Sequence, residues 1–511
     1  MPSTFFGLYI STSGILAAQA GLQTTSHNTA NENTKGYTRQ VATLQASSPA
    51  RAYARYGMIG SGVDVISIDQ MRDSYYDVKY RSNEAKLHEF TTKRNYTLQI
   101  EDYFNEIDTD GFTTEYKNIF TTLKSLQGNP SSLNYRTEFL HYCNSVADYF
   151  NEIQSNLEGL QRECNTEVSN LTGRINNLSS QIASLTKQIN TVEQTGAAAN
   201  DLRDKRELLL DELSAIVPID ISESTTVNGT THYQVKVNGF ILVNDYDAHE
   251  LVVVARENPN NKYDSPNLYD VYYYYNEELG SGTEFNVQSM GLSGELRSTL
   301  DMRDGNNGAA NPNPNAEIKY KGIPFYYEKV QEFKETMAKA FNDIHQKATI
   351  IDENGNEVPA NYNLENKTTE DIPIFVLSPN GKLSVNQELL DHPERMAVST
   401  HPIQDGVDNA GLLDRFLKLQ DAPIYRNGKA TEYLESITTE ISIDTNKAKT
   451  FEKNYENIRK SIENQRMAYS GVDGDEEGMN MVKYQEAFDL SSKMISVMAR
   501  IYDKLINETG V

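Results

Sequence analysis

Apolar side chains at the C-terminal end of the chain follow a heptad pattern. From Met481 onward they advance in steps of three and four, with Ser491 in the one gap: Met481, Tyr484, Phe488, Ile495, Met498, Tyr502 and Leu505. This spacing predicts a helix with a single apolar seam. A second stripe runs beside the seam and widens the apolar face, through Ala487, Met494 and Ile501.

The N-terminal end carries a repeat of the same length. Large apolar residues recur every seven positions, at Leu8, Ile15 and Leu22. Glycines keep the same interval, at Gly7, Gly14 and Gly21. A glycine inside a helix costs about 1 kcal/mol relative to alanine, and this cost is tolerated where another backbone must come close. We therefore expect the two ends to be partners.

Two arrangements of these ends remain open. The helices could form an ordinary pair that closes the core of a monomer. Alternatively, they could bury their wide stripe against other copies of the chain. Ordering a helix costs roughly 1–2 kcal/mol of backbone entropy per residue, and burying the side chains of a single seam recovers only about the same total, so a further surface would be needed.

The interior alternates between helical and extended stretches. A loop at 26–40 and strands at 51–68 precede helical spacing at 71–107. The longest helix is expected to begin at Asn129-Pro130, an N-cap followed by proline in the first turn. Its seam runs from Cys143 to Cys164, takes one extra four-residue step to Val168, and continues to Val192, which is a coiled-coil stutter. After a turn at 195–200 a shorter helix returns antiparallel and ends at Pro218.

The apolar period changes to two from 219 to 290, which predicts a β-domain. Asn238-Gly239 lies between YQVKV and FILV and is a strong hairpin signal. Asn354-Gly355 and Asn380-Gly381 predict further hairpins in a second β-region. Helical spacing returns at 294–304, at 326–346 and from Gly411 to a hinge at 470–478, and 305–315 reads as a linker.

These elements predict an elongated α+β multidomain protein, with its terminal helices paired in a coiled-coil layer, a long helical rod and inserted β-rich domains. Residues 1–40 and 475–511 would form a terminal assembly domain. Residues 41–217, 291–347 and 411–474 would form the rod. Residues 218–290 would be one β-insert and 348–410 a smaller one.

Charge and composition narrow the function. The 511 residues hold 47 Lys and Arg against 72 Asp and Glu, a formal charge of −25 that argues against nucleic-acid binding and against adhesion to anionic lipid. No apolar run approaches the ~20 residues of a membrane span. The first residues lack the features of a cleaved secretory signal, so we expect either a cytoplasmic protein or export without one. Cys143 and Cys164 lie about 30 Å apart on one helix and are expected to be buried thiols.

Signals for chemistry are weak. The sequence has no H-E-x-x-H, C-x-x-C, P-loop or G-x-S-x-G motif. No two histidines stand at i,i+4, and His88, His141 and His345 are expected at helix surfaces or interfaces. The acids around Asp473 lack the order of a calcium loop and fit a helix N-cap. We therefore expect no enzyme, no cofactor and no metal site.

Both ends carry longer motifs. The stretch from Phe5 to Gln40 resembles the N-terminal signature of bacterial flagellar rod, hook and hook-associated proteins, N-x-A-N-x-x-T-x-G-Y. Its positions fall on Asn28, Ala30, Asn31, Thr34, Gly36 and Tyr37. Tyr484-Gln485 and Ala487-Phe488 are similar to the family's C-terminal signature. AANDLRDKRELLLDELS (198–214) and SGELRSTLDMRD (293–304) are similar to the hook-associated branch at the hook–filament junction. Gly474 and Phe488 depart from the usual residues, and the β-regions match nothing.

The resemblance implies a structural adaptor subunit that connects hook to filament, secreted by type III export and located in the flagellum. It implies a ring-like homo-oligomer that contacts the hook protein and a second hook-associated protein. A flagellar export chaperone would bind the C-terminal helix at Phe488, Ile495, Met498 and Leu505. The residues expected at subunit interfaces are Leu8, Ile15, Leu22, Asn28, Asn31, Gly36, Tyr37, Tyr484, Phe488, Ile495, Met498, Tyr502 and Leu505.

Three alternatives compete with this interpretation. A hook or distal rod subunit belongs to the same class, but the long helical hairpin at 130–216 argues against it. An exported peptidoglycan hydrolase would use a carboxylate pair. A cytoplasmic coiled-coil scaffold would not leave the cell.

Overall fold

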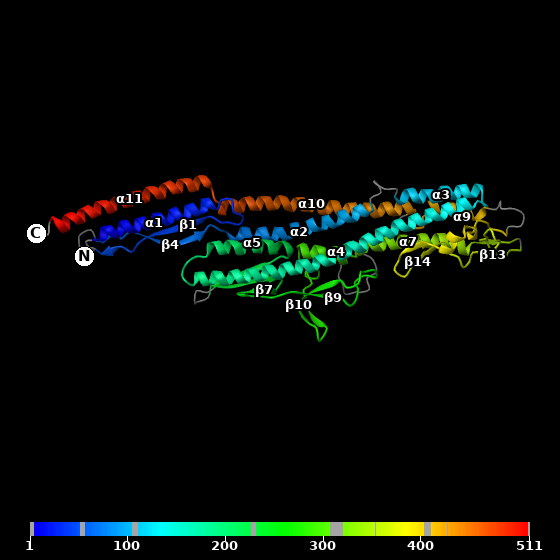
Figure 1. The fold of residues 1–511 in the computed structure, drawn as a ribbon, viewed down its shortest axis with the longest axis horizontal. Coiled ribbons are helices and arrows are strands. Elements are labelled where there is room, and N and C mark those ends of the chain that lie inside the picture. Colours follow the sequence, from blue (N-terminus) through cyan, green and yellow to red (C-terminus); the bar gives the residue numbers. More distant parts are fainter. Residues whose placement is uncertain are drawn as a thin grey trace.

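The chain folds into an elongated molecule with both termini at the same end (Figure 1). The computed structural model describes residues 5–51, 57–104, 111–225, 231–306, 320–352, 354–402, 410–426 and 428–508. Long helices run along the molecule, and small antiparallel sheets lie against them. The elongated α+β multidomain fold expected from the sequence is confirmed.

Two helices and a β-ribbon form the end that holds the termini. Helix α1 (Phe6–Ala30) lies beside α11 (Gly474–Asn507), and β1 (Gln40–Ala46) pairs antiparallel with β4 (Val63–Gln70). The ribbon packs on α1. The short strands β2 (Ala50–Arg51) and β3 (Met58–Ile59) pair with each other. We call α1, β1, β4 and α11, with the loops that join α1 to β1 and follow β4, the terminal layer.

Helices α2 (Ser74–Tyr103) and α10 (Ala430–Ser470) continue from this layer into the body of the molecule and pack side by side (Figure 1). Asp73 caps α2 by accepting a hydrogen bond from the Tyr75 N–H. Phe90 of α2 stacks on Phe451 and Tyr455 of α10, with ring centroids 4.8 and 5.6 Å apart. Aromatic stacking therefore joins two helices that are far apart in the sequence.

Helix α4 (Leu133–Glu193) is the longest element and begins later than expected. Ser132, not Asn129, caps it by accepting a hydrogen bond from the Tyr135 N–H. Asn129 instead ends α3 (Phe112–Gly128), where its N–H binds the carbonyls of Ser125 and Leu126. The predicted start at Asn129-Pro130 is wrong because these residues belong to the connection between two helices.

Helix α4 passes through two hydrophobic cores. Its residues up to Cys164 belong to one cluster, and those from Val168 onward belong to another. The change of core falls on the four-residue step that the sequence marks as a stutter. Cys143 and Cys164 are both fully buried on the seam, as expected.

Helix α5 (Asn200–Ile216) returns along α4 and leads into two small sheets. The first has the order β5-β6-β7-β8 and the second β11-β10-β9. Asn238 and Gly239 have φ angles of 46° and 91°, as a tight hairpin turn requires, which confirms the predicted hairpin. The strands are β5 (Asp220–Thr225), β6 (Thr231–Val237), β7 (Phe240–Asn244), β8 (Asp247–Ala248), β9 (Val252–Ala255), β10 (Tyr269–Asn276) and β11 (Ser281–Glu284).

Buried charges join the second sheet to the rod. Arg303 and Asp304 end α6 (Glu295–Asp304) and are almost fully buried. Arg303 donates to the Asp304 carboxylate at 2.7 Å and to the carbonyl of Tyr269 on β10, and Arg256 lies 3.1 Å from the same carboxylate. The LDMRD segment therefore anchors the β-insert.

The far end of the molecule is built on α7 (Ile323–Lys347). The hairpins at Asn354-Gly355 and Asn380-Gly381 are confirmed by the pairs β12–β13 and β14–β15. The elements here are β12 (Thr349–Ile351), β13 (Glu357–Pro359), β14 (Phe375–Leu377), β15 (Leu383–Val385), α8 (Gln387–Asp391), η1 (Pro393–Arg395), α9 (Gly411–Lys418) and η2 (Leu419–Asp421). His345, expected at a helix surface or interface, is fully buried in α7, because backbone groups of the loops that follow bind both of its ring nitrogens. Most of the predicted linker at 305–315 lies outside the described residues.

Candidate functional site

The two terminal helices pack antiparallel in a single register. Gly7 faces Met498, Gly14 faces Ser491 and Gly21 faces Tyr484. A contact that lies seven residues further along α1 therefore falls seven residues earlier on α11. The glycines confirm that the two helices are partners, but they make room for side chains of α11, whereas their spacing predicted a close approach of its backbone.

The seam of α11 is only half-buried in this pairing. Tyr484, Phe488, Ile495, Met498 and Tyr502 all have intermediate exposure. Leu505 was expected on the seam but is 51% exposed. Tyr502 contacts Phe5, the first described residue, with ring centroids 5.0 Å apart, and Leu505 lies almost one turn further along α11.

The remaining apolar surface of α11 faces solvent. Among its described residues only Glu477 is buried. Exposed apolar side chains recur along one face, at Leu490, Met494, Val497 and Ile501. The pair is thus internal to one chain, but neither helix contributes a residue to the two hydrophobic cores.

Helix α1 buries small residues on two faces. Leu8, Ile15 and Leu22 are half-buried, whereas Ser11, Ala18 and Thr25 beside α11 are fully buried. A second face meets the ribbon, where the Val63 N–H donates to Ser13 Oγ at 3.1 Å. This face was not predicted from the sequence, although small residues at 13, 17 and 24 repeat with helical spacing.

The signature residues lie in and directly after the last turn of α1. We call this cluster, with the three residues that follow it, the lock: Asn28, Asn31, Gly36, Tyr37, Thr38, Arg39 and Gln40. Asn28 is buried and makes two hydrogen bonds with the backbone of Gln40, at 2.8 and 3.0 Å. The Tyr37 hydroxyl donates to Asn28 Oδ1 at 2.7 Å, and burial raises the pKa of Tyr37. Gly36 has a φ of 81°, which favours glycine. Asn31 donates to the carbonyl of His27 at 3.0 Å.

The lock is tied to α5 through Asp204. Both the N–H and the hydroxyl of Thr38 donate to the Asp204 carboxylate, and Gln70 Nε2 donates at 2.8 Å. Desolvation raises the pKa of Asp204 to about 6, although Thr38 and Arg72 act to lower it. The sequence analysis did not single out Asp204 or Gln70.

The lock is also tied to the α10–α11 hinge. Asp473 caps α11 by accepting from the N–H groups of Asp475 and Glu476, as expected. Arg39 Nε donates to the buried Glu477 at 2.7 Å, and the Arg39 N–H binds the carbonyl of Ser470.

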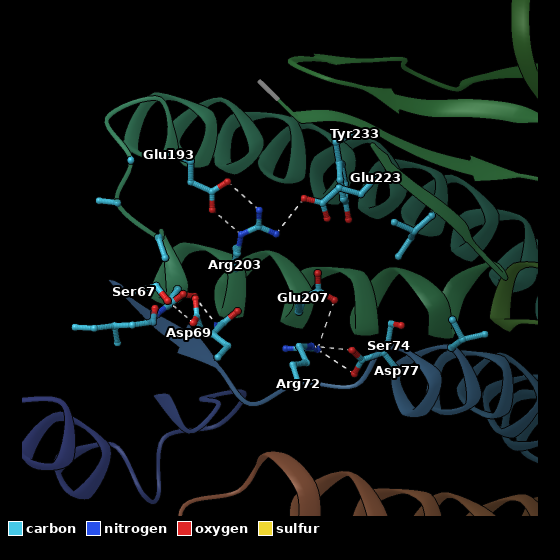
Figure 2. A pocket seen from close by; sticks show the side chains of 18 of the residues that line it. Ser67, Asp69, Arg72, Ser74, Asp77, Glu193, Arg203, Glu207, Glu223 and Tyr233 are labelled. Atoms are coloured by element: carbon cyan, nitrogen blue, oxygen red, sulfur yellow. Dashed lines mark hydrogen bonds and ion pairs between the residues drawn. The ribbon is translucent and has the colours of Figure 1, made fainter. Parts of the chain in front are cut away.

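A cavity of about 1120 Å³ lies beside this region, between β4, α2, α5 and the first sheet. Figure 2 shows Arg203 held between Glu193 and Glu223, and Arg72 directed to Asp77 and Glu207. The arginines of the wall are thus already paired with carboxylates. In the described part of the chain no three His, Cys, Asp or Glu side chains are placed to hold a metal ion. None of its described helices has the length and apolarity needed to cross a membrane.

Comparison with known families decides the identity. Residues 97–358, more than half of the chain, match the model of the flagellar hook-associated protein FlgK helical domain. The chain belongs to the FlgK family. Residues 463–508 match the C-terminal model of the flagellar basal body rod FlgEFG proteins. The family signature expected at the C-terminal end is therefore confirmed, and the chain is a component of the bacterial flagellum.

Relatives match along their whole length. Flagellar hook-associated protein 1 of Bacillus subtilis is 27% identical over 532 residues, covering 100% of this chain and 99% of the relative. The proteins of the same name from Salmonella typhimurium and Escherichia coli are each 24% identical, covering 97% of this chain and 98% of the relative. A solved structure of the flagellar hook junction protein FlgK from Burkholderia pseudomallei shares the fold, with a TM-score of 0.54 at 13% identity, over 76% of this chain and 99% of that one.

Proposed function

We propose that this FlgK-family chain is the adaptor that joins hook to filament, and that neighbouring copies form a ring through their terminal layers. The observation that carries the proposal is the exposed apolar face of α11. Leu490, Met494 and Ile501 are 63%, 48% and 45% exposed, although the helix is already paired with α1. A regular stripe of this kind calls for a further helix or sheet beside it.

Charge distribution supports the same proposal. Residues 1–70 hold four Lys and Arg against three Asp and Glu, and residues 471–511 hold four against eight. Most of the formal charge of −25 therefore lies on the rod and the β-inserts. Residues 1–70 are thus nearly neutral, and the net −4 of residues 471–511 comes from Asp473, Asp475, Glu476 and Glu477 before the apolar face of α11, so that the packing faces themselves can come close.

The partners and domains belong to the proposal. The hook protein and a second hook-associated protein would lie on either side of the ring. An export chaperone would cover the apolar face of α11 before secretion. We keep the domain boundaries proposed from the sequence, but add the β1–β4 ribbon to the terminal assembly domain because it packs on α1. The chain would act without catalysis, and a clearing band in cell-wall zymography of the purified protein would contradict this.

The experiment changes the outer face of α11 and leaves its seam intact. Leu490→Asp and Ile501→Asp should keep the thermal stability of the monomer but abolish incorporation into flagella of a strain that lacks its own junction protein. Ser496→Asp is the matched control, because Ser496 is an exposed polar residue of the same helix. Ile495→Asp and Met498→Asp should also abolish incorporation, with the rod still folded. Normal incorporation of the outer-face variants would refute the proposal.

A further inference from the structure

The first turns of α5 form a docking platform for the terminal layer. Asn200 donates to Gln40 Oε1 at 3.2 Å and to the carbonyl of Ile68 at 2.8 Å. Gln70 Nε2 donates to the carbonyl of Asn200 and to Asp204, both at 2.8 Å. Asp204 also accepts the two hydrogen bonds from Thr38. Three segments of the layer therefore meet a few residues of α5.

The two hydrophobic cores of the rod do not extend into the terminal layer. The two hydrophobic cores contain no described residue of α1, β1, β4 or α11. A cavity of about 1120 Å³ is lined by residues of β4 and of the first sheet. Hydrogen bonds at a few points, together with the chain connections into α2 and α10, therefore hold the layer on the rod.

Asp204 is the most connected of these points. It is buried, and its two oxygens accept bonds from the α1–β1 loop and from β4. Arg72 lies 3.5 Å from it. Removing the carboxylate leaves the N–H and the hydroxyl of buried Thr38 without their acceptor, whereas Gln70 keeps the Asn200 carbonyl.

We propose that Asp204, with Asn200 beside it, is a positioning residue that sets the angle of the terminal layer on the rod. This inference rests on the proposed function, because the angle matters only when terminal layers of neighbouring copies must fit together. It also assigns a role to residues 198–214, because polar side chains in the first turns of α5 bind the terminal layer.

Spin labels on the full-length chain test the proposal. One label goes on exposed Gln19 of α1 and the other on exposed Lys187 of α4, each replaced by cysteine. The native Cys143 and Cys164 are fully buried and will not compete for the label. At pH 7.5 the distance distribution from pulsed electron resonance should be narrow in the parent chain. In Asp204→Ala it should become at least twice as wide.

Three controls isolate the effect. A second pair, Glu163 and Lys187 on α4, lies about 36 Å apart along the helix and should give the same distribution with and without Asp204→Ala, since both labels report on the rod. Asp343→Ala removes an exposed carboxylate of α7 and should leave both pairs unchanged. Asp204→Asn keeps the side-chain volume and should give an intermediate width, which covers the case that the alanine variant does not fold.

Two results would overturn the inference: an unchanged Gln19–Lys187 distribution in Asp204→Ala, or a distribution in the parent chain that is already as wide. Incorporation of the unlabelled parent chain into flagella separates the two proposals. If the parent chain fails to incorporate, the proposed function fails whatever the spin labels show.

Discussion

Gly21 lies directly beneath the ring of Tyr484. A Cβ atom at position 21 would come within 2.5 Å of the ring carbons Cδ1 and Cε1, closer than side chains approach in folded proteins. The same register places Gly7 2.5 Å from Met498 Cε and Gly14 2.8 Å from Ser491 Oγ by the same measure. The seven-residue glycine repeat therefore reflects the close packing of α11 side chains on α1.

Gly21→Ala should separate α11 from α1. Alanine favours the helix itself by about 1 kcal/mol, but its methyl group cannot fit under the Tyr484 ring. We expect amide hydrogen exchange of α11 to rise at least tenfold, with α4 unchanged. Gly478→Ala is the matched control, because a Cβ there meets nothing within 4 Å, and it should slow exchange. Equal effects of the two substitutions would show that the register is wrong.

His345 should make the distal end sensitive to acid. Its Nδ1 donates to the Ile372 carbonyl at 2.6 Å and its Nε2 accepts from the Ala397 N–H at 2.9 Å, which only the neutral ring can do. Burial lowers the pKa of His345 to about 4, whereas the unfolded chain binds the proton near 6.5. The folded state therefore loses stability as pH falls from about 6.5 to 4, by about 2 kcal/mol between pH 7 and pH 5.

Hydrogen exchange of α7 at the two pH values measures this loss, after correction for intrinsic rates. His345→Gln should remove the pH dependence. His141→Gln, on the exposed surface of α4, should keep it. An unchanged slope in His345→Gln would assign the acid sensitivity to another group.

Asp304→Asn should weaken the attachment of the β-insert. Desolvation would raise the pKa of Asp304, but the guanidinium groups of Arg303 and Arg256 hold it at about 2. Removing one partner of a buried pair leaves charges uncompensated and costs about 3–5 kcal/mol. Chemical denaturation should show this loss, whereas Asp247→Asn, on an exposed strand residue, should cost less than about 0.5 kcal/mol. A loss of that smaller size for Asp304→Asn would mean that the arginines find other partners.

Salt should promote assembly of the purified chain. The acidic rods repel one another, and about 0.1 M salt limits that repulsion to roughly 10 Å. We expect the concentration needed for assembly to fall several-fold between 50 and 300 mM NaCl, as followed by sedimentation. If salt instead dissolves the assemblies, ion pairs and not apolar faces hold them together.

Local patterns in the sequence predicted local structure well. The Asn238-Gly239 hairpin, the buried cysteines of α4 and the glycine repeat all follow from spacings of a few residues. The attachment of the terminal layer to α5 could not be predicted this way, because Thr38 and Asp204 are 166 residues apart and each is an ordinary polar residue in its own segment. The burial of His345 depends on Ile372 and Ala397, which are equally invisible from its helix.

The same limit applies to the interface residues. Leu8, Ile15 and Leu22 are half-buried on α1, and the seam of α11 from Tyr484 to Tyr502 is half-buried in the same chain, so heptad spacing identified a helix pair and not yet a contact between copies. Asn28, Gly36 and Tyr37 belong to the lock within the chain. Their part in subunit contacts stays a prediction, and the exposed face of α11 is where we expect copies to meet.

Hydrogen exchange of the full-length chain, first as a monomer and then in assembled flagella, tests the central claim most directly. In the monomer, amides of α1 and α11 should exchange at least a hundredfold faster than those of α4 between Val146 and Val168. On assembly their exchange should slow to the rate of α4. The account is contradicted if α1 and α11 are as protected as α4 in the lone molecule and gain nothing on assembly.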